Sequence, residues 1–220
     1  MTKAYLGDLD GQVWRFTIAL NDSNEPTLSA PASLYSAGSA GHPLFSSMAA
    51  VTVGTSQYLF FGTGSDLLPS TGINYSYKLV GLLEGSSTSF SLDLTKTDGL
   101  ADDEKVTAFP AVAGDIVFFT TTSFKPTTPC SLPDANLYAV TFIGGAAYAS
   151  SNDNDDNVGK NESPKVKTLA GVGRATAPFI VDQHLWFGAG EKIEAFGDPE
   201  DFNNGVGQIG VRILSWRQLR

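Results

Sequence analysis

An aromatic-rich strand pattern recurs four times along this chain and constrains its fold more than any other feature. Each unit has an apolar and aromatic run that ends in glycine or threonine, then a polar turn, then a second run with an aromatic near its end. The units lie at residues 4–16, 58–81, 117–142 and 185–196. Their spacing of about 55 to 65 residues is typical of large, loop-decorated blades of a β-propeller.

The expected strands are short and are bounded by glycine, proline, asparagine, aspartate or serine, whereas helical periodicity is almost absent. Strands that lie between neighbouring blades are buried on both faces, so they should be apolar almost without interruption. Residues 59–61 and 117–119 are such runs, and further strands at 48–53, 108–112 and 177–181 open the last three units. The pattern therefore predicts an all-β fold, a β-propeller with about four four-stranded blades.

We expect one propeller domain over residues 1–220, or the C-terminal portion of one, with blade insertions at 21–46, 63–76, 123–135 and 150–165. The charged stretch 100–106 is expected to be a loop that enters a strand. A closed propeller of large blades usually has six to eight of them. We therefore expect this chain to be part of a larger propeller, with its exposed blade faces covered by another chain or domain.

The composition indicates a folded, acidic protein. Hydrophobic residues make up 42% and charged residues 17% of the 220 residues, and the formal net charge is −9. An acidic chain is repelled by phosphate backbones and anionic lipids, so nucleic acid is not an expected partner, and divalent cations are a more natural match. No segment approaches the roughly 20 apolar residues of a membrane span. Cys130 is the single cysteine, so it is either a free thiol or paired with a segment outside this chain.

An acidic loop within residues 151–160 is the candidate metal site. Asp153, Asp155 and Asn157 have the 1, 3, 5 spacing of calcium-binding loops. However, the sixth position is Val158 instead of glycine, and the twelfth is Pro164 instead of glutamate, so the sharp turn and the closing ligand are missing. We expect a solvated loop here, with weak calcium binding as the alternative.

Other polar motifs favour structural roles. Asp10-Gly11 lies between two strand-like runs and predicts a hairpin turn rather than a metal half-site. Residues 62–64 and 188–190 have the form Gly-x-Gly, but neither opens a helix, so we expect turns rather than phosphate cradles. Arg15 is expected to bond carboxylates or carbonyls at a blade edge. Only two histidines occur, and no zinc or hydrolytic-triad motif accompanies them, so no catalytic residue is predicted.

Several motifs occur in a characteristic order. Residues 5–16 read YLGDLDGQVWRF, residues 59–64 LFFGTG, residues 115–122 DIVFFTTT, residues 129–131 PCS, residues 137–139 LYA and residues 215–219 SWRQL. In this order they resemble the C-terminal part of the PilY family of exported proteins. The corresponding family patterns are YxGDLxGNLWRFD, VYFGTGKYL, GRVIFTTxxP, DPC, LxALD and a final SWRQL.

The resemblance implies a bacterial outer-membrane, pilus-tip or cell-surface location. It also implies a non-enzymatic role in type IV pilus assembly, in control of pilus retraction and in surface adhesion. The implied partners are pilus proteins or the N-terminal part of the same protein, and a surface or host ligand. The family's calcium loop lies just before the YxGDL strand, where this sequence has not yet begun, so no calcium ligand is carried over.

Two other functions stay open. A quinone-dependent dehydrogenase can have the same fold, but it needs carboxylate and metal ligands that converge over the propeller channel, and the sequence shows no such cluster. The third alternative is a structural scaffold that only supports a partner domain.

Overall fold

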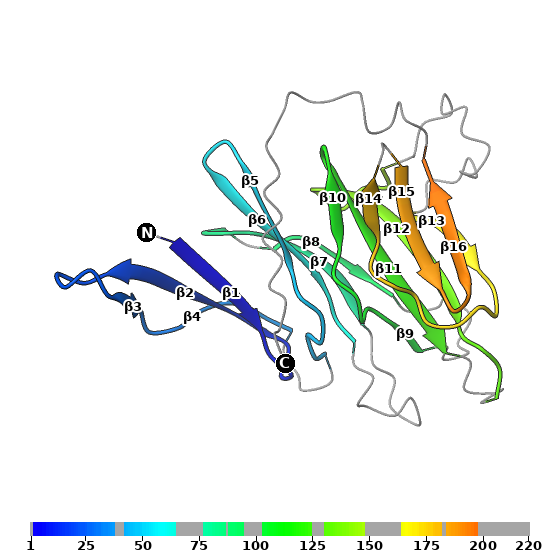
Figure 1. Ribbon diagram of the computed structural model, residues 1–220, viewed down its shortest axis with the longest axis horizontal. Coiled ribbons are helices and arrows are strands. Elements are labelled where there is room, and N and C mark those ends of the chain that lie inside the picture. Colours follow the sequence, from blue (N-terminus) through cyan, green and yellow to red (C-terminus); the bar gives the residue numbers. More distant parts are fainter. Residues whose placement is uncertain are drawn as a thin grey trace.

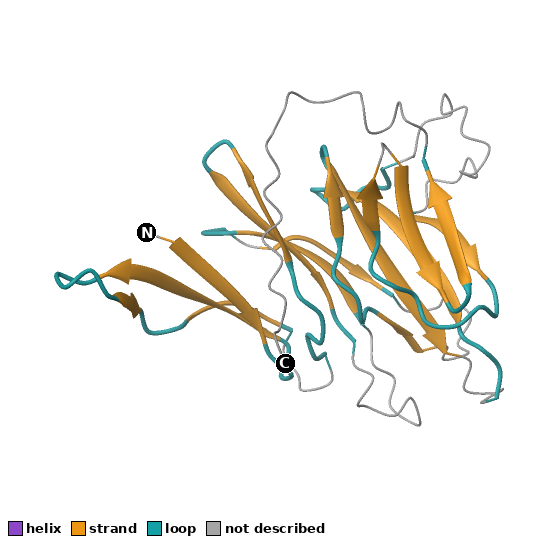
Figure 2. Ribbon diagram, in the orientation of Figure 1, coloured by secondary structure: helices purple, strands orange, loops and turns teal. Residues whose placement is uncertain are grey.

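The computed structural model describes residues 2–37, 42–64, 77–86, 88–94, 103–124, 130–147, 164–181 and 184–197. These residues form sixteen strands in four antiparallel sheets, which follow one another in sequence order (Figures 1 and 2). We call the sheets blades 1 to 4. Within this described part, no helix is long and apolar enough to cross a bilayer.

The strand bounds are as follows. Blade 1 contains β1 (Thr2–Gly7), β2 (Gln12–Leu20), β3 (Pro26–Leu28) and β4 (Ala32–Ser36). Blade 2 contains β5 (Ala49–Val53), β6 (Ser56–Gly62), β7 (Lys78–Leu83) and β8 (Thr88–Asp93). Blade 3 contains β9 (Asp103–Lys105), β10 (Ala111–Ala113), β11 (Ile116–Phe124), β12 (Asp134–Thr141) and β13 (Lys165–Leu169). Blade 4 contains β14 (Phe179–Val181), β15 (His184–Ala189) and β16 (Lys192–Phe196).

Three apolar clusters fill the interfaces between successive blades. One joins blades 1 and 2, the second joins blades 2 and 3, and the third joins blades 3 and 4. Neighbouring residues of one strand point to opposite faces of the sheet. Accordingly, Phe60 packs between blades 2 and 3, whereas the adjacent Phe61 packs between blades 1 and 2. The predicted continuous apolar runs are therefore confirmed as strands buried on both faces.

The strands β5, β10 and β14, one from each of blades 2, 3 and 4, lie side by side. β10 contacts β5 of the preceding blade and β14 of the following blade. These three strands are also the edge strands of their sheets, each paired on one side only, with β6, β11 and β15 respectively. They are the inner strands of a propeller arrangement, and they lie along its axis.

Two expected loops contain strands. The segment 21–46, expected as an insertion, includes β3 and β4, which both pair with β2. The stretch 100–106 includes β9, which pairs with the end of β11. Both were missed because strands of three to five residues are too short to show a clear periodicity, and pairing with a longer neighbour defines them. Most of 63–76 and 150–165, and the strand expected at 208–217, lie outside the described residues.

Candidate functional site

The inner strand is interrupted in each of blades 2, 3 and 4. In blade 2 Leu44 bridges Gly64, and regular pairing begins again only at β5. In blade 3 the chain leaves the sheet between β9 and β10. In blade 4 Ala175 bridges Ala189, and regular pairing resumes at β14. Three loops thus interrupt the sheets at the propeller axis.

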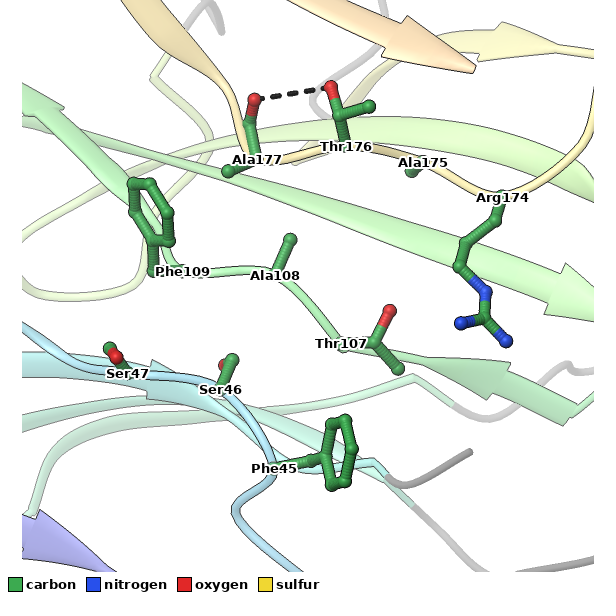
Figure 3. Close-up of a pocket in the computed structure, with 10 residues that line it drawn as sticks. All are labelled: Phe45, Ser46, Ser47, Thr107, Ala108, Phe109, Arg174, Ala175, Thr176 and Ala177. Carbon is green, nitrogen blue, oxygen red and sulfur yellow. Dashed lines mark hydrogen bonds between the residues drawn. The ribbon is translucent and has the colours of Figure 1, made fainter. Parts of the chain in front are cut away.

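The three interruptions occupy equivalent positions. The first paired residues after them are Ala49, Ala111 and Phe179, whose partners are Phe60, Phe118 and Trp186 respectively. These partners hold the same place in the repeated aromatic strand. Counting back from the paired residues, the triplets 45–47, 107–109 and 175–177 are therefore equivalent. Together with Arg174 they line an open pocket of about 450 Å³, which we call the axial pocket (Figure 3).

Proline fixes two of the interruptions. Pro110 and Pro178 directly follow the pocket triplets of blades 3 and 4, and both are buried. Proline has no N–H to donate to a sheet, and it restrains the residue before it to an extended conformation. The two prolines therefore end the strand pairing beside the pocket.

Hydrogen bonds between blades hold the triplets in place. The N–H of Leu44 donates to the carbonyl of Asp8 at 3.0 Å, and the N–H of Val106 donates to the carbonyl of Thr63 at 3.1 Å. In the next interface the Thr120 hydroxyl donates to the carbonyl of Thr176 at 2.6 Å. Each pocket segment is thus anchored to the preceding blade.

A glycine makes one of these close approaches possible. A Cβ atom at Gly62 would collide with the side chain of Val106. The Gly-x-Gly motif at 62–64 is therefore not the expected turn. It lies at the end of β6, where Val106 of blade 3 packs against Gly62. In the motif at 188–190, Gly188 and Ala189 lie within β15, and only Gly190 belongs to a turn.

The axial pocket combines aromatic rings, hydroxyls and one cation. Phe45 and Phe109 are 45% and 48% exposed, and they come from different blades. Hydroxyls line the pocket from all three blades, at Ser46, Ser47, Thr107 and Thr176. Arg174 is the charged side chain among the described lining residues, which include no carboxylate, histidine or cysteine. The pocket therefore does not fit the carboxylate and metal ligands that a quinone-dependent dehydrogenase requires.

A second polar cluster lies within blade 3. The Glu104 side chain is 3% exposed, and one of its oxygens accepts hydrogen bonds from Thr121 at 2.5 Å, Asn136 at 3.0 Å and Tyr138 at 2.8 Å. Its other oxygen accepts from Lys165 Nζ at 3.1 Å. Burial, together with the nearby Glu104 charge, raises the pKa of the Tyr138 hydroxyl, so this phenol stays neutral and donates. The cluster crosslinks β9, β11, β12 and β13, and its role is structural.

Glu84 connects blades 1 and 2 in a similar way. Its carboxylate accepts from Lys3 at 2.8 Å, from Tyr5 at 2.9 Å and from Arg15 at 2.7 Å. The carboxylate prediction for Arg15 is thereby confirmed. Burial favours the neutral form of Glu84, but the hydrogen bonds from Lys3, Arg15 and Tyr5 outweigh it and hold its pKa below the ordinary value.

The Asp8–Gly11 segment forms the predicted hairpin. One Asp8 oxygen accepts from the N–H groups of Asp10 and Gln12, and the other accepts from the Trp14 indole at 2.7 Å. Gly11 has φ +78°, which glycine adopts readily. Burial disfavours the Asp8 carboxylate, but these hydrogen bonds prevail and lower its pKa. The Asp8 carboxylate thus stabilises the hairpin that it begins.

The predicted calcium residues Asp153, Asp155 and Asn157 lie outside the described residues. Within the described ranges, no group of three or more His, Cys, Asp or Glu side chains could hold a metal ion. Cys130 is exposed at the surface of the described part of the chain.

Sequence reasoning did not single out the residues of the axial pocket. They come from positions about 65 residues apart, and each triplet taken alone reads as an ordinary loop. The signal that could have found them is their common offset from the repeated aromatic strand, since equivalent positions of successive blades meet at the axis.

Comparison with known proteins bears on the fold. The sequence matches no protein-family profile and no curated protein. Among solved structures, the chain is similar to the PilY1 C-terminal domain of Pseudomonas aeruginosa, with a TM-score of 0.61 and 17% sequence identity. The match covers 90% of this chain but 57% of the PilY1 chain, so this chain spans little more than half of its length. The predicted propeller, and the resemblance to the PilY family in fold, are confirmed.

Proposed function

We propose that this chain is a binding and assembly domain of a type IV pilus-associated protein at the bacterial cell surface. The observation that carries the proposal is the fold similarity to the PilY1 C-terminal domain over 90% of the chain. The PilY-like motifs support it because they follow the family order along the sequence. In this role the chain contributes to pilus assembly, to control of retraction and to surface adhesion, and it acts without catalysis.

The two buried carboxylates of the described residues have structural partners. The buried carboxylates Glu84 and Glu104 are committed to partners in their own or the neighbouring blade. A general base must reach the proton that it abstracts, and side chains used as crosslinks are not available for this. Expected partners are pilus proteins, the N-terminal part of the same protein, and a ligand on the colonised surface.

The test is an in-frame deletion of residues 2–197 in the native gene, with the intact gene supplied in trans as the control. We expect the deletion strain to lose surface piliation or twitching motility and to attach poorly to surfaces. Complementation should restore these properties. Normal piliation, motility and attachment in the deletion strain would contradict the proposal.

A biochemical measurement distinguishes the proposed binding role from the dehydrogenase alternative. Purified protein, mixed with a pyrroloquinoline cofactor and calcium, is assayed for dye-linked oxidation of alcohols. We expect no turnover above that of heat-denatured protein, whereas sustained oxidation would favour the dehydrogenase.

A further inference from the structure

The axial pocket differs in charge from the rest of the chain. The chain carries a formal net charge of −9, yet Arg174 is the charged group among the described residues that line this pocket. A guanidinium has five donors in a planar fork, so it can serve its contacts within the chain and still bind a carboxylate. Arg174 therefore gives the pocket a group that can bind an anion.

Two aromatic rings frame the same space. In Figure 3 the Arg174 side chain extends toward the side of the pocket where Thr107 and Phe45 lie, and Phe109 lies at the opposite end. Almost half of each phenyl side chain is exposed. Apolar surface of this kind is stabilised when a ligand covers it.

The hydroxyl lining adds hydrogen-bonding capacity. Thr176 Oγ1 is already used, because it donates to the Ala177 carbonyl and accepts from the Gly188 N–H. Ser46 Oγ, by contrast, is buried and has no hydrogen-bond partner among the described residues. The hydroxyls of Ser47 and Thr107 are the remaining groups of the lining that can bond a polar ligand.

We propose that the axial pocket binds a small carboxylate-bearing polyol, the chemistry of an acidic sugar unit. The carboxylate pairs with Arg174, the sugar ring lies against Phe45 on the same side of the pocket, and the sugar hydroxyls bond the side chains of Ser47 and Thr107. A volume of about 450 Å³ lies within the usual range for small-ligand sites. This site goes beyond the proposed pilus function and does not depend on it.

The site is built before the ligand arrives. Pro110 and Pro178 restrain the loops, and the hydrogen bonds of Leu44, Val106 and Thr120 anchor them to the preceding blades. A preorganised site loses less conformational entropy on binding. Because the pocket is open and the ligand small, we expect a dissociation constant on the order of 1 mM for a single sugar unit.

The experiment is an NMR titration of the full isotope-labelled chain with glucuronate, and with glucose and benzoate as comparisons. Glucose lacks the carboxylate, and benzoate lacks the hydroxyls. We expect glucuronate to shift amide signals of residues 45–47, 107–109 and 174–177, and to bind roughly ten-fold more tightly than either comparison compound. Equal binding of glucuronate and glucose, equal binding of glucuronate and benzoate, or shifts confined to other residues would overturn the proposal.

Variants give the matched control. Arg174→Ala should weaken glucuronate binding about ten-fold, and Arg174→Lys should weaken it less because the charge is kept. Phe45→Ala should weaken binding, whereas Phe179→Ala should not. Phe45 and Phe179 are 45% and 49% exposed, but only Phe45 lines the pocket. Unchanged glucuronate binding by Arg174→Ala, or an equal loss of affinity in the two phenylalanine variants, would refute the site. The folding control is the spectrum of each variant without glucuronate, which should match that of the unaltered protein outside the pocket residues.

Discussion

Replacing Glu104 with alanine removes an acceptor that side chains of three other strands share. The carboxylate on β9 receives hydrogen bonds from Thr121 on β11, from Asn136 and Tyr138 on β12, and from Lys165 on β13. All of the donors except Lys165 are buried. The variant therefore leaves polar groups inside blade 3 without their acceptor.

The expected loss follows from what each donor can do next. Asn136 keeps contacts with Ser123 and Thr121, and Lys165, whose side chain is 34% exposed, can turn to solvent. Tyr138 is 5% exposed and loses its acceptor, which costs about 1–3 kcal/mol. With the cavity and the broken ion pair added, we expect unfolding free energy to fall by about 3–5 kcal/mol.

The assay is urea unfolding at neutral pH, monitored by tryptophan fluorescence, with Glu194→Ala as the matched control. Glu194 on β16 pairs at 3.3 Å with Lys167 on β13, the strand that also contains Lys165. Unlike Glu104, however, the Glu194 side chain is 35% exposed. Exposed pairs contribute about 0–1 kcal/mol. If Glu104→Ala destabilised the protein no more than Glu194→Ala does, the cluster would not hold blade 3 together, and the reasoning would fail.

Three further predictions concern other parts of the chain. The pKa of Glu84 is lowered in the folded state, so its stabilising effect is complete above the unfolded-state pKa of about 4.3 and is lost as pH falls through the folded-state pKa. Glu84→Gln should therefore flatten the dependence of the unfolding free energy on pH, measured by urea unfolding between about pH 7 and 3. If the free energy of the variant fell with pH as steeply as that of the unaltered protein, the prediction would be wrong. Gly190→Ala should destabilise more than Gly114→Ala, because both have φ near +60° but only at Gly190 would the new Cβ collide with a carbonyl, that of Val172; equal melting temperatures would speak against it. Calcium at millimolar concentration should raise the melting temperature slightly if Asp153 and Asp155 bind it, and the rise should vanish in Asp153→Asn/Asp155→Asn; an equal rise in that variant would exclude this loop.

The sequence alone determined the blade architecture. The aromatic runs at 59–61 and 117–119 are apolar without interruption, and only strands covered on both faces tolerate such a run. Their recurrence at a blade-like spacing then predicted stacked sheets. The Asp10-Gly11 hairpin was equally readable because its turn chemistry is local.

Only the tertiary structure decided the short strands and the candidate site. β4 and β9 form because β2 and β11 supply their hydrogen-bond partners, and their five and three residues are too few for a strand to be recognised from the sequence. In the sequence Glu104 resembles an ordinary surface charge, whereas in the fold hydrogen-bond donors from β12 and β13 surround it. Phe45, Phe109 and Arg174 come from three different blades, and they share one pocket because the blades pack face to face around an axis. The hydrophobic pattern of a strand shows whether its faces are buried. Which distant loops come together depends instead on strand register and on packing between blades, and no local sequence pattern encodes these.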